Sequence, residues 1–556
     1  MMKNKKNPTR LIPVCALLTV CLSSLTGCNK KVPDTDQTLE VWTAKLGFGS
    51  DWTKDLLDAF KEEAWVKEKY PNLQTIFETS ADRSAINTRL DAGEGVNTVD
   101  LVFSDSVTPY MGEDNQGNAR SVDLTDVVYR SKVPGEDITV YDKLRDDWKA
   151  QTAYYSVGEN SFSGKVPYKT YDFLWGSGMM GIVYNEELYK SFGYDVPPRT
   201  SEELIEVSNK IKEGNDKYKE GYTYMYSAGG DYMGYLYQIW WGQYEGIDNI
   251  YNYYQGIGFD GENYVEKSSD IFKQIGRKEA MNELIKLSMK ENGLRYARGA
   301  ATDFKAAQKF YFQGKGVFMC NGDWLAEENK EDLAASPYHF KMMKTPIISS
   351  IRQKTPSIPD DATLRKVVQA IDEGKTFGMA NIDGVSEADY QTIMDARGVT
   401  LSLGAGFHSC IPSYAAGKDV AVDFLRFMAT DKAQEIYAKA TGGATLPFKY
   451  KMSDKAIFND FSDLQKSVID MREKSIYNST CMPLGTNMPL VKFGNLGIWT
   501  SYALNGTWDI NYAQNGSLDP KNEWSAQAAY DRDIDYWTNN NGEKWNNALR
   551  LAGFIK

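Results

Sequence analysis

Histidine and cysteine are scarce in this chain of 556 residues. It has two histidines, His339 and His408, and six cysteines, of which three lie within the first 28 residues and the others are Cys320, Cys410 and Cys481. Their wide separation fits no zinc spacing, so we expect no metal site. Three cysteines cannot all pair, so at most one disulfide can form among the last three. We interpret Cys320 and Cys410 as small buried apolar residues.

The chain also lacks an excess of positive charge. Its 63 lysine and arginine residues are outnumbered by 75 acidic residues, which gives a net charge of −12. A chain this acidic has little to neutralise phosphates, so we expect no nucleic-acid partner. Beyond the N-terminus there is no second apolar run long enough to span a bilayer. What is there is a globular composition, 42% hydrophobic, and a length that suggests two or more domain-sized units.

The N-terminus has the three parts of a secretory signal. Four basic and no acidic side chains precede an apolar run, residues 11–22, which is shorter than the roughly 20 residues of a spanning helix. The motif Leu-Thr-Gly-Cys, ending at Cys28, resembles the lipobox of bacterial lipoproteins. That resemblance implies cleavage of a signal peptide, residues 1–27, and acylation of Cys28. The alternative is an ordinary secretory signal with a chance cysteine.

Removal of residues 1–27 changes the net charge from −12 to −16, because the segment carries four basic and no acidic residues. Residues 28–38 are polar and contain proline, so we expect them to form a flexible tether. Two acyl chains are enough for stable anchoring. We therefore expect a domain held at the outer face of a membrane.

Behind the tether the sequence predicts alternating strands and helices. Strands are expected over residues 39–43, 73–77 and 99–103, with helices over 51–69 and 81–91 between them. This order is typical of a parallel α/β sheet.

A second α/β region is expected to start with a strand over residues 181–185. The segment Thr-Ser-Glu-Glu at 200–203 is a capping box before a helix. Further elements are expected as helices over 185–192, 303–312, 419–428 and 430–439, a strand over 316–320, and a surface loop over 348–361.

Five patches in this order resemble the extracellular solute-binding proteins of carbohydrate ABC importers, the maltose-binding-protein-like group. They are residues 39–43 with the helix after them, Leu-Asp-Ala-Gly at 90–93 through 100–105, Tyr-Asn-Glu-Glu-Leu at 184–188 followed by 197–204, 312–316 through Gly-Asp-Trp at 322–324, and 423–428 through 431–434. The resemblance fades over residues 106–165, 215–300 and 451–556.

The resemblance implies a two-lobe α/β fold of the periplasmic-binding-protein type, with interlobe hinge strands and a ligand cleft. The first lobe is expected over residues 36–170 and 346–432, and the second over 171–345 and 433–556. The implied protein is a monomer without cofactor or enzymatic activity. It captures a carbohydrate and delivers it to the permease subunits of an ABC transporter. The length of the chain and its aromatic content favour an oligosaccharide over a monosaccharide, and the lipid tether indicates a Gram-positive cell surface.

Sugar binding requires flat aromatic rings for the C–H faces of a pyranose and polar side chains for its hydroxyl groups. Trp324 matches the place of the family's second-lobe stacking tryptophan, with a core position as the alternative. Asp105 ends a strand, where open α/β sheets bind ligands, although it could equally cap a helix. The other candidates are Asp323, Trp42, Glu78, Asp172, Trp175 and Trp499.

Three different functions stay open beside sugar capture. A lipid-anchored glycoside hydrolase needs two carboxylates across a sugar cleft, and such a pair cannot be excluded among 75 acidic residues. No Gly-x-Ser-x-Gly, His-Glu-x-x-His or P-loop motif favours an enzyme, and His408 has no identifiable acid partner in the sequence. The second function is that of a glycan-binding surface adhesin, and the third is that of an oligopeptide-binding importer component.

Overall fold

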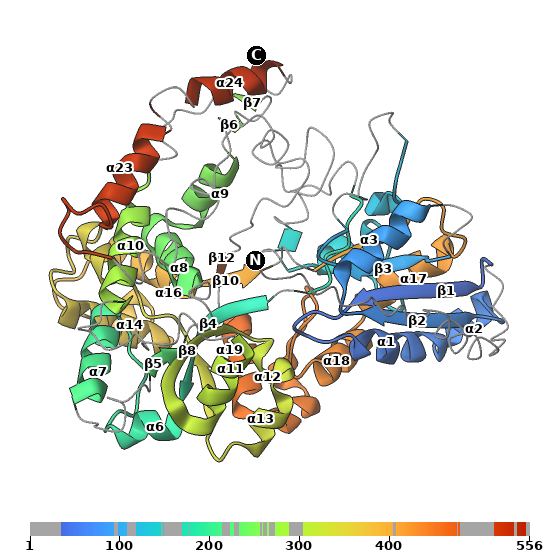
Figure 1. Ribbon diagram of the computed structural model, residues 1–556. Helices are drawn as coiled ribbons and strands as arrows, with labels where there is room; N and C mark the ends of the chain where they lie inside the picture. Colours follow the sequence, from blue (N-terminus) through green and yellow to red (C-terminus); the bar gives the residue numbers. More distant parts are fainter. Residues whose placement is uncertain are drawn as a thin grey trace, which may run out of the picture.

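The computed structural model shows two α/β lobes, each built on its own sheet (Figure 1). The structure describes residues 35–93, 98–107, 110, 118–145, 148–149, 170–176, 178–213, 223–226, 233–255, 258–259, 264–265, 273–288, 304–403, 407–474, 476–478, 516–536, 538 and 542–551. The statements below concern these residues. We call the elements around the four-stranded sheet the first lobe and those around the six-stranded sheet the second lobe.

The sheet of the first lobe has the order β11-β3-β1-β2. Its strands are β1 (Thr38–Ala44), β2 (Gln74–Ser80), β3 (Leu101–Ser104) and β11 (His408–Cys410). β2 and β3 both pair parallel to β1, as the strand-helix alternation predicts, and β11 pairs antiparallel to β3. The first three predicted strands are therefore confirmed, with ends shifted by a few residues.

Helices cover both faces of this sheet. α1 (Asp51–Lys61) packs on the face that carries Leu39 and Val41, and α3 (Arg83–Ala92) packs on the face that carries Ala44. The predicted helix over residues 51–69 is divided into α1 and α2 (Ala64–Lys69), because Glu63 has extended backbone angles between them. The first lobe also contains η2 (Thr125–Tyr129), α4 (Val140–Lys143), α17 (Lys418–Met428) and α18 (Asp431–Ala440).

The predicted helix pair near residue 430 is confirmed. Thr430 caps α18 by accepting a hydrogen bond from the backbone N–H of Ala433. α17 packs on α1 through an edge-to-face contact of Phe60 with Phe424, whose ring centroids are 5.4 Å apart. Segments more than 350 residues apart in sequence thus build one core.

The sheet of the second lobe has the order β12-β10-β4-β8-β5, and β9 pairs with β4 off this path. Its strands are β4 (Gly178–Asn185), β5 (Thr223–Tyr226), β8 (Gly316–Gly322), β9 (Phe340–Met343), β10 (Val399–Leu403) and β12 (Ile476–Asn478). β6 (Gly258–Phe259) and β7 (Tyr264–Val265) form a separate ribbon. The central strand β4 is buried along its whole length, so it needs helices on both faces.

The helices of the second lobe follow the expected order where the sequence predicts them. The capping box is confirmed, since the hydroxyl of Thr200 accepts the N–H of Glu203 at the start of α7. The longer helices are α6 (Glu186–Ser191), α7 (Ser201–Glu213), α8 (Met233–Glu245), α9 (Ile247–Gln255), α10 (Ile275–Ser288), α11 (Phe304–Phe310), α13 (Lys330–Ala335), α14 (Asp361–Asp372), α16 (Glu387–Gly398), α19 (Asp463–Lys474), α23 (Ala526–Tyr536) and α24 (Gly542–Leu551). Shorter turns are η7 (Tyr311–Lys315), α12 (Leu325–Glu328), η8 (Ser349–Gln353), α15 (Phe377–Ala380), η10 (Met452–Asp454) and η11 (Ala456–Asp460).

Two expectations differ from the structure. β10 pairs antiparallel with β4, and α14 and α16 pack in the same lobe, whereas the expected boundary places residues 346–432 in the first lobe. The segment 348–361 contains η8, and its Ile348, Ile351 and Ile358 are buried, so it is not a surface loop. Apolar residues among the prolines and serines pull this segment into the core.

The chain passes from one lobe to the other at three places: between Thr170 and β4, between β10 and β11, and between α18 and α19. We call these the first, second and third crossings. No described helix combines the length and the apolar character that crossing a membrane requires. Cys320 and Cys410 are buried, as the sequence indicates, whereas Cys28 and Cys481 lie outside the described residues.

Candidate functional site

The indole of Trp324 packs against two glycines, Gly178 at the start of β4 and Gly322 at the end of β8. We call this pair the glycine floor. A Cβ atom added to Gly178 would lie 2.2 Å from the ring atom Cζ3, and one added to Gly322 would lie 2.5 Å from the ring. Any larger residue at these two positions would therefore displace the ring. Only 8% of Trp324 is exposed. Glycine on two neighbouring strands lets a large ring lie close to the backbone.

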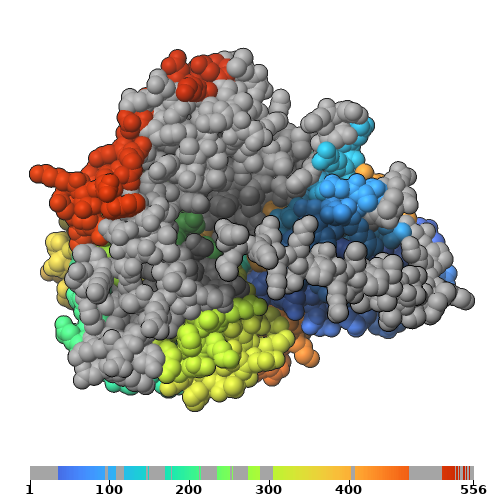
Figure 2. Space-filling model, in the orientation of Figure 1, coloured from blue at the N-terminus to red at the C-terminus, as the bar shows by residue number. Residues whose placement is uncertain are grey.

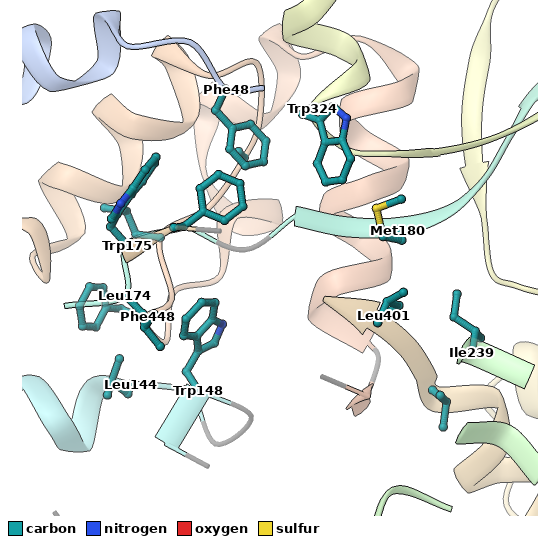
Figure 3. Packing of buried hydrophobic residues seen from close by; sticks show 14 of the residues in the cluster. Phe48, Leu144, Trp148, Leu174, Trp175, Met180, Ile239, Trp324, Leu401 and Phe448 are labelled. Carbon is teal, nitrogen blue, oxygen red and sulfur yellow. The ribbon is translucent and has the colours of Figure 1, made fainter. Parts of the chain in front are cut away.

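Trp324 also touches the first lobe. Its ring meets Phe48 edge to face, with centroids 6.4 Å apart, and a Cβ at Gly47 would lie 3.0 Å from its side chain. Figure 3 shows Phe48 and Trp324 facing each other from opposite sides of the boundary. In the space-filling view, the yellow-green atoms of α12 and α13 and the blue atoms of the first lobe meet below the centre of the face (Figure 2). Trp324 therefore lies where the two lobes meet.

Aromatic contacts continue from Phe48 into the crossings. Phe48 packs on Phe407 with ring centroids 5.3 Å apart, and Phe407 meets Trp175 edge to face at 5.1 Å. The ring centroid of Trp175 in turn lies 4.5 Å from that of Trp52 in α1. This row of rings joins the first and second crossings to the contact made by Trp324.

Asp323, predicted to bind ligand, has both carboxylate oxygens engaged within the protein. Oδ1 accepts a hydrogen bond from the N–H of Met179 at 3.2 Å, and Oδ2 pairs with the guanidinium of Arg472. Its own N–H donates to the carbonyl of Met179 at 2.9 Å. Only 2% of the side chain is exposed. In this structure Asp323 fixes the turn before Trp324 and offers no surface to a ligand.

Asp172 and Trp175, also predicted to face the cleft, lie in the core. Asp172 Oδ2 is 2.7 Å from His408 Nδ1, and its Oδ1 accepts the N–H of Ser409 at 3.0 Å. The indole N–H of Trp175 donates to the carbonyl of His408 at 3.1 Å. A backbone hydrogen bond from the N–H of Phe173 to the carbonyl of Ser409 adds to these bonds. Together they tie the first crossing to the start of β11, where the second crossing ends.

The expectation that His408 has no acid partner is wrong, since Asp172 fills that role from 236 residues away. The pair does not activate a nucleophile in the described part of the chain. The hydroxyl of Ser409 donates to the carbonyl of Phe173, and burial raises the pKa of the Cys410 thiol to about 12. Both His408 and Asp172 are fully buried, so substrate cannot reach them.

Trp42 and Glu78, both predicted in the site, lie opposite each other on β1 and β2. The guanidinium of Arg89 is 4.0 Å from the centre of the Trp42 ring and joins Glu78 at 2.7 Å and Glu40 at 2.6 Å. A cation over the ring covers the face that a sugar would use. The structure thus brings these two candidates together but occupies Trp42 with Arg89.

Asp105 follows β3 at the carboxyl edge of the parallel strands, as predicted. Its carboxylate pairs with the guanidinium of Arg83 in the first turn of α3, and about half of the Arg83 side chain is exposed. Arg83 lies in the helix predicted over residues 81–91, where only a surface position was expected for it. The N-cap of α3 is Asp82, whose side chain accepts the N–H of Ser84. An exposed ion pair at this edge offers both donors and acceptors to a ligand.

Trp499 and Cys28 lie outside the described residues, so the structure does not place them. Among the described ranges, no group of three histidine, cysteine or acidic side chains has the arrangement of a metal site. Three residues at the site come from outside the predictions, Phe48, Arg83 and Arg472. The glycines on both sides of Phe48 are a signal that could have pointed to a close contact, whereas nothing in the sequence around Arg472 marks it.

Residues 78–465 match the family described as bacterial extracellular solute-binding protein, which is well over half of the chain. Among solved structures, the chain resembles an ABC substrate-binding protein from Listeria monocytogenes in complex with cycloalternan, with a TM-score of 0.52 and 13% identity over 93% of this chain and 99% of that one. It also resembles apo RafE from Streptococcus pneumoniae, with a TM-score of 0.52 and 14% identity over 92% and 99% of the two chains. A third likeness is the GacH receptor of Streptomyces glaucescens, solved unliganded and with acarbose, with a TM-score of 0.50 and 14% identity over 90% and 97%. At these identities the structures show the fold alone, and no curated protein matches the chain.

Proposed function

This chain belongs to the bacterial extracellular solute-binding proteins, and we propose that it captures an oligosaccharide between its lobes and delivers it to an ABC permease. The observation that carries the proposal is the position of Trp324 on its glycine floor at the boundary between the lobes. Structural relatives solved with cycloalternan, raffinose and acarbose support the class of ligand.

Binding by this arrangement needs no bond to break. A sugar ring that stacks on Trp324 of the second lobe and donates to Asp105 of the first gains contacts from both lobes only when they are close together. The closed population then rises by the difference between the ligand's affinities for the two states. A permease that recognises the closed form would receive loaded protein.

We propose a reduced set of binding residues. Trp324 is the stacking platform, and Asp105 and Glu78 are polar partners at the carboxyl edge of the first sheet, with Arg83 beside Asp105. Trp42 can stack on a sugar with that face of its ring only if the guanidinium of Arg89 moves away from it. Trp499 stays a prediction, whereas Asp323, Asp172 and Trp175 support the site from within the protein.

We further propose that the mature protein is a monomer anchored at the outer face of the cell membrane through acylated Cys28. Residues 28–38 keep the loaded form within reach of the permease. The protein acts on no substrate chemically, and the sugar leaves it unchanged.

The test is a thermal-shift screen of the mature chain with raffinose, acarbose, cycloalternan and maltotriose, followed by small-angle scattering and recovery of the sugar. We expect at least one sugar to raise the melting temperature, reduce the radius of gyration and be recovered intact. Trp324→Ala should weaken its binding by about 1 to 3 kcal/mol, or roughly 5- to 150-fold. The matched control is Trp65→Ala, because Trp65 lies in α2 against Phe60 of the first lobe.

Two results would overturn the proposal. If no tested sugar raises the melting temperature or reduces the radius of gyration, the proposal that the protein captures a carbohydrate is refuted. Cleavage of the bound sugar would identify a glycoside hydrolase instead.

A further inference from the structure

We propose that Arg472 is a positioning residue for Trp324, and this inference rests on the proposed stacking role of that ring. Arg472 lies in the last turn of α19, in the region where the sequence resemblance fades. Only 3% of its side chain is exposed, and its guanidinium pairs with the carboxylate of Asp323, of which 2% is exposed. Asp323, which directly precedes Trp324, is therefore held by the buried positive charge of Arg472 in α19.

The turn that carries Trp324 is fastened at two points. Asp323 exchanges two hydrogen bonds with Met179 of β4, through its own N–H and through Oδ1. Arg472 holds the other carboxylate oxygen. Trp324 is the N-cap residue of α12, and its ring lies over Gly178, which directly precedes Met179. The same short stretch of β4 thus holds the turn and supports the ring.

Charge explains why Arg472 sets the geometry. A buried carboxylate without its cationic partner is unfavourable, so it would turn toward water and carry the adjoining backbone with it. A shift of the turn changes the angle at which the indole leaves the backbone, because Trp324 is one peptide bond away. Stacking on a flat sugar face is sensitive to that angle.

Arg472 is also joined to the third crossing. Its Nη1 donates to the hydroxyl of Thr445 at 3.3 Å, and Nη1 of Arg145, from the first lobe, lies 3.5 Å from the same oxygen. The arginine that fixes the platform therefore contacts the segment that joins α18 to α19. Arg472 thus contacts both the residue that precedes Trp324 and the third crossing.

The experiment uses the mature protein labelled with 5-fluorotryptophan and observed by ¹⁹F NMR without any sugar. Trp324→Phe identifies the Trp324 signal among the 13 tryptophans of the chain. We expect Arg472→Met to shift or broaden that signal and Arg472→Lys to restore part of its position. Arg397→Met is the matched control, since Arg397 is a buried arginine of the same lobe that pairs with Asp372 and donates to the carbonyl of Thr345. It should leave the Trp324 signal in place.

A binding arm uses raffinose, or the sugar selected by the thermal-shift screen if raffinose does not bind. Arg472→Met should weaken binding tenfold or more in the wild-type background and should add no loss in the Trp324→Ala background. An unmoved Trp324 signal in folded Arg472→Met, or an equal loss of affinity in both backgrounds, would overturn the inference. If Arg472→Met does not fold, Asp323→Asn tests the same contact, and it too must move the signal.

The two arms separate the failure of this inference from that of the proposed function. A wild-type protein that binds none of the sugars refutes oligosaccharide capture, whereas the ¹⁹F signal still decides whether Arg472 sets the ring.

Discussion

Phe48 and Trp324 meet edge to face across the boundary between the two lobes, with their ring planes 78° apart. Phe48 comes from the loop between β1 and α1, and Trp324 comes from the turn between β8 and α12. An opening of the lobes must separate these rings, so the environment of Trp324 reports the distance between the lobes.

Gly178→Ala should displace the Trp324 ring. The added Cβ would lie 2.2 Å from Cζ3, and both the strand backbone and the indole are rigid. We expect the free energy of unfolding to fall by about 1 to 3 kcal/mol, measured by urea unfolding. The same change in a Trp324→Ala background should cost less than half as much, because the obstructing ring is gone.

Gly378→Ala is the control for that substitution. No atom lies within 4 Å of a Cβ at Gly378, which is in α15, so the change should be neutral or stabilise by up to about 1 kcal/mol. Equal losses from Gly178→Ala with and without the Trp324 ring would contradict the glycine floor.

Asp172→Ala should destabilise the protein strongly. The change leaves His408 Nδ1 and the N–H of Ser409 buried without their acceptor. Removing one partner of such a buried pair costs about 3 to 5 kcal/mol, which urea unfolding can measure. Asp126→Ala should change stability by less than about 0.5 kcal/mol, because its ion pair with Arg130 is exposed. A loss below about 1 kcal/mol for Asp172→Ala would show that the pair does not hold the crossings together.

His339 should titrate above the ordinary histidine pKa of about 6.5. A hydrogen bond to Glu187 raises the pKa of His339, the negative charge of Glu187 adds to it, and Asp463 and Glu186 contribute further. A raised pKa in the folded state stabilises the protein below pH 6.5, and this contribution is lost as the pH rises through the raised value. NMR titration of the two histidines, with His339→Asn for assignment, measures it. Glu187→Gln should return the pKa toward 6.5, and a wild-type value at or below 6.5 would refute the pairing.

Cys28→Ser should release the protein from the cell. Without a thiol to acylate, the two acyl chains that would hold the protein at the membrane are lost. We expect the wild-type protein in the membrane fraction and the variant in the medium, with radiolabelled palmitate incorporated only by the wild type. Cys320→Ser is the control, since Cys320 is buried in the second lobe. Equal incorporation of palmitate by Cys28→Ser and the wild type would exclude lipid anchoring at this residue.

Local patterns were enough to predict much of the fold. Strands such as β1 and β4 alternate or are uniformly apolar, and the caps at Thr200 and Thr430 use short-range hydrogen bonds that the sequence displays. The division of the helix at Glu63 and the burial of Ile351 depend on packing with distant elements, so local patterns could not give them.

Side-chain roles were predicted less well, because they depend on partners far away in sequence. Asp172 was predicted to face the cleft, but it is buried and hydrogen-bonded to His408, which lies 236 positions later in the sequence. Asp323 was in the right turn, but Arg472 lies 149 positions away and takes its carboxylate. Trp324 stays a prediction, and the glycines that lie against its ring, Gly178 and Gly322, come from two neighbouring strands.

The pairing of Asp172 with His408 limits how the lobes can rotate. The first and second crossings are joined by backbone hydrogen bonds as well as by this buried pair, so they must twist together about a shared axis. The third crossing, residues 440–463, has to follow that rotation through its own torsions. Any rotation between the lobes is therefore expected to keep the first two crossings in register with each other.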